Sequence, residues 1–252
     1  MKRVILTLII IVSCFSRSYS QSGVKDSIIR FPFVGVSYGI YQPGGDLSDR
    51  FGVTSMLSGD VLFKSKKNLL FGFSGGFMFG DKVKEPDLLK SIYTQNEQII
   101  GYDGLYADVR IFERGYQFSG TFGKIFAFKK PNPNSGIIVI GGPGFMQHKI
   151  RIENVGNTAP QLTKEYLKGY DRLTNGLMMR EFVGYVYFSN HQLVNFYAGM
   201  EFIQAFTQSR RDYNFDTPEL KDNENRTDLL YGFKVGWILP LYKKKPASYY
   251  FY

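Results

Sequence analysis

The sequence predicts an all-β fold, an eight-stranded antiparallel β-barrel that spans a membrane, and three observations predict it. Apolar residues alternate with small or polar residues in eight segments. The connections between these segments alternate between short and long. The chain of 252 residues combines 17% aromatic residues with 27 glycines, which suits aromatic lipid interfaces and a narrow lumen better than a soluble core.

The expected strands cover residues 33–41, 53–64, 69–80, 116–128, 136–152, 181–188, 194–207 and 229–242. The alternation is clearest in 69–80, where Phe71, Phe73 and Phe77 share one face and glycines occupy much of the other. The last segment, LLYGFKVGWILPLY, also presents an apolar face suited to lipid, and we expect it to close the barrel against 33–41. Pro143 predicts a bulge or a local edge within the fifth strand.

The connections predict the orientation of the barrel. Short turns occupy 65–68, 129–134 and 189–193, long loops occupy 81–115, 153–180 and 208–228, and 42–52 is intermediate. Outer-membrane barrels place short turns in the periplasm and long loops outside the cell. We therefore expect the long loops to be extracellular and both termini to be periplasmic.

The N-terminus has the layout of a secretory signal peptide. Lys2 and Arg3 precede an apolar run that is too short to span a bilayer, and small residues around position 20 predict cleavage after Ser20. Residues 1–20 are then the signal, 21–28 a short periplasmic segment, 29–242 the barrel and 243–252 a periplasmic tail. The only cysteine, Cys14, leaves an alternative open, because the preceding residues also resemble a lipoprotein signal in which Cys14 is acylated.

The charge pattern argues against a nucleic-acid partner. The formal charge of +9 loses Lys2, Arg3 and Arg17 with the signal, which leaves +6. The lysine clusters each follow an apolar strand, at 64–67, 129–130 and 243–245. Solvation of the strand ends and anionic lipid headgroups explain such clusters better than a soluble basic face.

Three segments carry a resemblance to a known family. They are YGIYQPGGDLSDRFG (38–52), YADVRIFERG (106–115) and GYDRLTNG (169–176). With the strand layout, they make the chain resemble the small outer-membrane β-barrel proteins of Bacteroidota, a family of uncertain function. The resemblance implies a bacterial outer-membrane location and no assigned catalytic motif.

Three charged residues are expected inside the barrel: Asp60, Glu201 and Lys234 all fall on the inward phase of their strands. One interpretation is a selectivity filter or proton relay. The other is a neutralising ion pair in a lumen filled with side chains. An eight-stranded barrel has little room for a conduit, which favours the structural interpretation.

The residues for catalysis or metal binding are sparse. His148 and His191 are the two histidines, and no serine-bearing motif near His148 marks a nucleophile. Two histidines and no cysteine after the signal argue against zinc. We therefore predict no catalytic, cofactor or metal site, and keep a lipid-modifying enzyme based on His148 as an alternative.

The long loops are rich in tyrosine and arginine, which are frequent at protein-binding hot spots. The candidate partner-binding residues are Tyr106, Arg110, Phe112, Arg114, Tyr170, Arg172, Arg210, Arg211 and Tyr213.

The sequence thus predicts a non-enzymatic structural or binding barrel, an accessory subunit of a larger outer-membrane complex for secretion, nutrient uptake or barrel assembly. The expected partners are outer-membrane lipid, other outer-membrane proteins contacted through the loops or the wall, and the barrel-assembly machinery during biogenesis. A narrow transport pore is the alternative.

Overall fold

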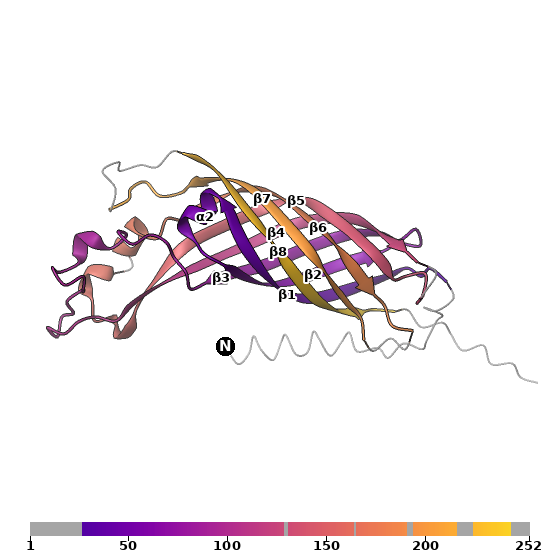
Figure 1. Ribbon diagram of the computed structural model, residues 1–252, viewed down its shortest axis with the longest axis horizontal. Coiled ribbons are helices and arrows are strands. Elements are labelled where there is room, and N and C mark those ends of the chain that lie inside the picture. Colours follow the sequence, from indigo (N-terminus) through magenta and orange to yellow (C-terminus); the bar gives the residue numbers. More distant parts are fainter. Residues whose placement is uncertain (1–26, 129–130, 164, 191–193, 216–223, 243–252) are drawn as a thin grey trace, which may run out of the picture.

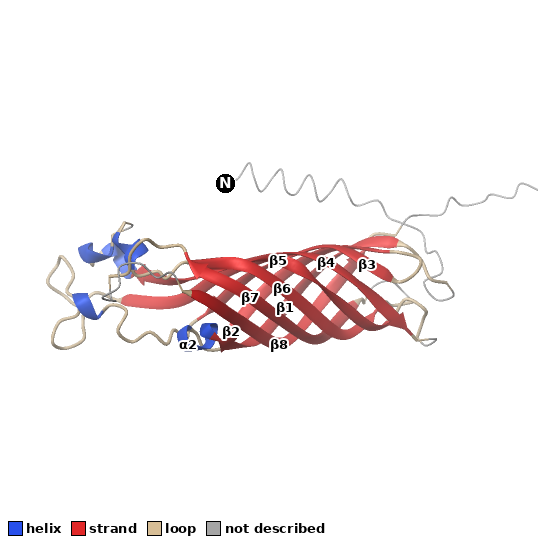
Figure 2. Ribbon diagram, turned by 90° about the horizontal axis from the view of Figure 1, so that it is seen from above, coloured by secondary structure: helices blue, strands red, loops and turns tan. Residues whose placement is uncertain are grey.

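The computed structural model describes residues 27–128, 131–163, 165–190, 194–215 and 224–242, which form a closed barrel (Figure 1). Its eight strands run antiparallel in chain order, and the last strand pairs with the first (Figure 2). The predicted fold class and all eight predicted strands are confirmed. None of the helices in the described ranges is long and apolar enough to cross a membrane.

The strands are β1 (Phe31–Gly45), β2 (Thr54–Lys64), β3 (Leu69–Gly80), β4 (Val109–Ala127), β5 (Gly136–Asn154), β6 (Thr174–Tyr187), β7 (Phe196–Ser209) and β8 (Asn225–Pro240). The helical segments are α2 (Asp46–Arg50) and the 3-10 turns η1 (Lys90–Ile92), η2 (Val155–Asn157), η3 (Pro160–Leu162) and η4 (Tyr166–Gly169). We call the end of the barrel with the long connections the loop end, and the opposite end the turn end.

Several strands extend further toward the loop end than the sequence predicts. β4 begins at Val109 instead of 116, β6 at Thr174 instead of 181, and β8 at Asn225 instead of 229. The added residues carry polar and charged side chains on both faces, so the apolar alternation that reveals a membrane strand is missing there. Continued ladder hydrogen bonding holds these residues in the sheet without an apolar face.

Two details of strand pairing match the expectations. β8 closes the barrel against β1, with Val36 opposite Trp237 and Gly39 opposite Lys234. The β4–β5 ladder is interrupted beside Pro143, which has no N–H to donate. The register is the same on both sides of this interruption, so it is a local break in pairing and no residue is inserted as a bulge.

The outward face of the barrel is apolar on all eight strands. Large side chains that are more than a third exposed there include Val36, Ile40, Leu57, Val61, Phe71, Phe73, Phe118, Phe122, Val139, Leu177, Val183, Met200, Phe206, Phe233, Val235 and Trp237. A soluble barrel would expose polar side chains at these positions. The alternation therefore has its apolar side outside, as in a barrel that contacts lipid.

The interior is filled in three layers. An apolar cluster near the loop end includes Leu47 and Phe51 of the α2 region, together with Met56 and Met78. A second apolar cluster near the turn end includes Phe31, Phe33, Leu70 and Phe188. Buried charged and hydroxyl side chains lie between the two clusters.

Several predictions fall on residues outside the described ranges. They are the signal peptide 1–20, the Cys14 alternative, most of the segment 21–28, the tail 243–252 and His191. These stay predictions.

Candidate functional site

The candidate site is the charged layer in the middle of the lumen. The alternation of the strands turns Asp60 of β2, Arg180 of β6, Glu201 of β7 and Lys234 of β8 inward. Arg180 Nε lies 2.6 Å from Glu201 Oε1, and Lys234 Nζ lies 3.0 Å from the same oxygen. Arg180 Nη2 lies 3.8 Å from Asp60 Oδ1. Two carboxylates and two cations thus form one neutral group.

Hydroxyl groups complete the coordination of both carboxylates. Tyr197 donates a 2.5 Å hydrogen bond to Asp60 Oδ2, and Ser74 donates a 2.6 Å bond to Asp60 Oδ1. Tyr41 donates to Glu201 Oε2. Each of the four carboxylate oxygens in this layer therefore accepts at least one hydrogen bond.

The burial of this layer distinguishes between the two predicted roles. The side chains of Asp60, Arg180, Glu201 and Lys234 are at most 3% exposed. Paired charges that water cannot reach do not form an open conduit. The geometry supports the structural interpretation, in which the layer satisfies charges within a filled lumen.

Sequence reasoning missed Arg180, the residue that links the two carboxylates. The apolar alternation predicts a sixth strand that begins at residue 181, which places Arg180 in the expected loop 153–180. The signal that identifies it is phase, since Arg180 shares the inward phase of β6 with Met178 and Phe182, both buried. Asp60 joins the group through Arg180.

A second buried polar group lies nearer the loop end. His148 Nε2 of β5 lies 2.9 Å from Asp228 Oδ2 of β8, and Thr207 of β7 donates a 2.5 Å hydrogen bond to the same oxygen. The carboxylate therefore lies between the hydroxyl and the imidazole, whereas a nucleophile must reach the base directly. Both His148 and Asp228 have side chains only 1% exposed. This geometry does not favour His148 as a catalytic base.

Loops and α2 cover the barrel at the loop end (Figure 1). Arg50 of α2 binds Glu85 through Nε at 3.0 Å, and Arg172 binds the other carboxylate oxygen at 3.3 Å. Burial under the loops lowers the pKa of Arg50 below its usual value, and Glu85 opposes that effect. We call Arg50, Glu85 and Arg172 the cap bridge. The cap bridge connects α2, the 81–108 connection and the segment that precedes β6.

Several predicted partner-binding residues are not available as a loop surface. Arg110, Phe112 and Arg114 lie in β4 and not in a loop, because the ladder with β5 continues past the membrane-facing residues. Tyr170 is 4% exposed and packs in the loop-end cluster, and Arg172 belongs to the cap bridge. Of these five residues only Arg110 is fully exposed, and their predicted role in partner binding stays a prediction.

The remaining predicted residues lie at the surface of the loop end. Tyr106 is 61% exposed and Tyr213 is 37% exposed, and Tyr213 packs against Phe215. Arg211 binds Asp171 through two hydrogen bonds of 2.5 and 2.7 Å, and these bonds raise its pKa. Arg210 is exposed and bonds to Asn175.

Within the described part of the chain, no group of three or more histidine, cysteine, aspartate or glutamate residues is placed to hold a metal ion. In the lumen, the charged side chains pair with one another.

The fold and the filled interior define a closed eight-stranded antiparallel β-barrel with an apolar outer wall. No protein-family model matches the sequence, and a search of curated proteins found no match. The chain is similar to crystal structures of three bacterial barrels. Neisserial surface protein A is 10% identical with a TM-score of 0.38, over 82% of this chain and 96% of that one.

Ail, the attachment invasion locus protein of Yersinia pestis, is 9% identical with a TM-score of 0.36, over 83% of this chain and 99% of Ail. The N-terminal β-barrel domain of Pseudomonas aeruginosa OprF is 9% identical with a TM-score of 0.33, over 82% of this chain and 96% of the OprF domain. At these values the similarities assign no family to this chain.

Proposed function

We propose that this chain is a non-enzymatic barrel of a bacterial outer membrane and a structural or binding subunit of a larger outer-membrane complex. The membrane location is supported by the apolar outward face of all eight strands. A structural or binding role is supported by the filled, charge-paired lumen, which leaves the outer wall and the loop end as the surfaces for interaction.

One residue on the outer wall carries the proposal of a protein partner. Glu181 of β6 falls on the outward phase, between Met179 and Val183, which are 43% and 46% exposed. Its side chain is half-buried, and no side chain in the described ranges forms a hydrogen bond or ion pair with it. A carboxylate in an otherwise apolar wall is costly against lipid.

The position of Glu181 is in the middle of the expected membrane span. It lies halfway along β6 between Asn175, where outward polar residues begin, and Tyr187 at the turn end. With ~3.3 Å per residue and a tilt of ~40°, this stretch spans about 30 Å along the barrel axis. The Glu181 side chain is therefore too short to extend its carboxylate to the water at either membrane interface.

A partner protein would satisfy this carboxylate better than lipid. Gly141 lies opposite Glu181 on β5, so the wall beside the carboxylate has no side chain on that strand. On β7, Phe202 lies opposite Glu181, and the polar Gln204 is the next outward residue toward the loop end. We infer that a second membrane protein donates a hydrogen bond or a cation to Glu181 at this wall. The larger complex that we propose is one for secretion, nutrient uptake or barrel assembly.

Affinity purification after mild detergent extraction tests the proposal. Glu181→Leu should lose the proteins that co-purify with the native chain, whereas Val183→Leu, an apolar change on the same face, should retain them. A photo-crosslinking residue at Gln204 should capture the same partner, and one at Val61 on the β2 wall should not. Recovery of the native chain only as a lone barrel in several mild detergents would overturn the proposal.

A further inference from the structure

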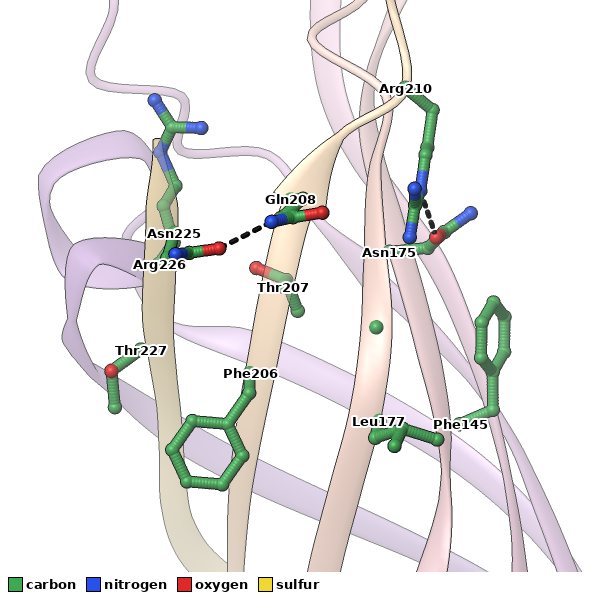
Figure 3. Close-up of a pocket in the computed structure, with 11 residues that line it drawn as sticks. Phe145, Asn175, Leu177, Phe206, Thr207, Gln208, Arg210, Asn225, Arg226 and Thr227 are labelled. Atoms are coloured by element: carbon green, nitrogen blue, oxygen red, sulfur yellow. Dashed lines mark hydrogen bonds between the residues drawn. The ribbon is translucent and has the colours of Figure 1, made fainter. Parts of the chain in front are cut away.

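The outer wall has a cavity at the loop end of β5, β6, β7 and β8. Its volume is about 560 Å³. Figure 3 shows Phe145, Leu177 and Phe206 on one side of it, and Asn175, Gln208 and Arg210 nearer the loop end. This cavity is on the outside of the barrel, apart from the lumen charges and from Glu181.

Strand register arranges the wall of the cavity in two outward rows. In the apolar row, Phe145 pairs with Leu177 and Leu177 pairs with Phe206. Leu177 is 73% exposed and Phe206 is 65% exposed. Such side chains at the edge of a membrane barrel contact the acyl chains of the adjacent leaflet.

The next outward row consists of amide side chains. Its members are Gln147, Asn175, Gln208 and Asn225, one from each of the four strands. Asn175 donates a 3.2 Å hydrogen bond to Gln147, and Gln208 donates to Asn225. Each primary amide has both donors and an acceptor, so this row offers groups of both kinds to the hydroxyls of a sugar.

A cation completes the row on its loop side. Arg210 Nε donates a 2.6 Å hydrogen bond to Asn175 Oδ1, which directs the side chain back toward the cavity (Figure 3). No described residue accepts a hydrogen bond from its terminal nitrogens, and Arg210 is exposed. A guanidinium with a free edge is suited to bind a phosphate through two parallel hydrogen bonds.

Two neighbours extend the positive charge along the same rim. Lys149 of β5 and Arg114 of β4 are directly opposed on the outward face. Asp171 supplies one negative charge that is shared by two cations, Arg211 at 2.5 Å and Lys149 at 3.7 Å. The rim therefore presents cations to the headgroup region, where an anionic ligand would compensate them.

We propose that this cavity binds one phosphorylated glycolipid of the outer leaflet. The proposal rests on the outer-membrane location proposed above. The acyl chains lie against Phe145, Leu177 and Phe206, the amide row binds sugar hydroxyls, and Arg210 binds a phosphate. Charge complementarity and the order of the rows, from apolar to amide to cationic, select this class over an uncharged lipid.

Native mass spectrometry of the full-length mature protein in detergent tests the site. The probes are bisphosphorylated lipid A, dephosphorylated lipid A and inorganic phosphate. Arg210→Gln should weaken binding of the bisphosphorylated form by about tenfold, because one charge-assisted contact is lost. Lys67→Gln, which removes an exposed cation from the 65–68 turn at the other end, should leave binding unchanged.

Three results would overturn the inference. They are equal binding of the dephosphorylated lipid, full competition by inorganic phosphate, and unchanged lipid binding by Arg210→Gln that has folded correctly. Folding is checked in each case by insertion into lipid vesicles and heat-modifiable gel mobility. A chain that fails to insert into vesicles contradicts the membrane proposal instead, so the two failures are distinguishable.

Discussion

At the scale of single residues, Arg180 is the cation that links the two carboxylates of the charged layer, Asp60 and Glu201. It lies within 4 Å of both Glu201 and Asp60, and it donates to Ser119 and Thr121 of β4 at 3.3 and 3.4 Å. Lys234, by contrast, contacts only Glu201 among the charged residues described. Removing Arg180 leaves two buried carboxylates with a single cation.

Arg180→Met should lower the free energy of unfolding by about 3–5 kcal/mol, since breaking a buried ion pair leaves an uncompensated charge. Urea unfolding from lipid vesicles measures this change. The only tryptophan, Trp237, is 52% exposed on the outer wall, so its fluorescence reports loss of lipid contact.

Lys66→Met, on the exposed turn after β2, is the matched control and should change stability by less than about 0.5 kcal/mol. A loss of stability no larger in Arg180→Met than in this control would show that the charged layer contributes nothing to the barrel. The double variant Arg180→Met with Glu201→Gln should not recover the full free energy of unfolding, because Asp60 still lacks a cation.

At the scale of elements, the sequence predicts the strand segments whose outward face is apolar. It does not predict the extensions of these strands toward the loop end, where the outward face is polar. Phe71, Phe73 and Phe77 mark β3 without ambiguity, because lipid on one side and a crowded lumen on the other impose a period of two. Arg110 and Glu113 lie on opposite faces of β4 beyond this zone, and no local pattern shows that the ladder continues.

The sequence also does not predict the cap that α2 and the long connections form at the loop end. α2 has only five residues, and its role depends on Arg50 reaching Glu85 across 35 positions of sequence. Arg180 is hard to identify for a related reason, because the apolar alternation of its strand begins only after it. Interior charge positions follow from strand phase, whereas contacts between loops depend on three-dimensional closure.

The cap bridge should control the order of the loop end without affecting the barrel. In Glu85→Gln, Arg50 and Arg172 lose their shared carboxylate, and the like charges then oppose each other. We expect cleavage by trypsin within the 81–108 connection to become several-fold faster. Limited proteolysis of the vesicle-inserted protein measures this rate.

Asp87→Asn is the control, since Asp87 is exposed and pairs only with Lys90 at the surface. Its cleavage rate should match that of the native chain. Equal cleavage of Glu85→Gln and the native protein would mean that the apolar cluster around Leu47 and Phe51 holds the cap without the bridge.

At the scale of the whole molecule, three filled layers block the path from one end of the barrel to the other. The turn-end cluster places Phe31, Phe33 and Phe188 in mutual ring contact, with centroids 5.2 to 6.2 Å apart. Beyond it lie the charge layer and then the loop-end cluster with its cap. Side chains therefore fill the lumen at three levels along the barrel axis.

The purified chain should therefore show no discrete conductance steps in planar lipid bilayers. Glu201→Gln and Lys234→Met remove charges from the middle layer but open no path, because the apolar layers on both sides remain packed. Both variants should be as silent as the native chain. Phe31→Ala together with Phe188→Ala removes large side chains from the turn-end layer only, and it should also stay silent because the charge layer and the loop-end layer remain.

Steps that appear in the native chain and change in size with Glu201→Gln would contradict this expectation and favour the narrow-pore alternative. Steps whose size does not depend on Glu201 or Lys234 would indicate leakage around the barrel. The outcome depends on geometry more than on charge: a selectivity filter must contact water, and at most 3% of each charged side chain in this layer does so. The interactions that we propose for the barrel are at its outer wall and its rim, where Glu181 and Arg210 lie.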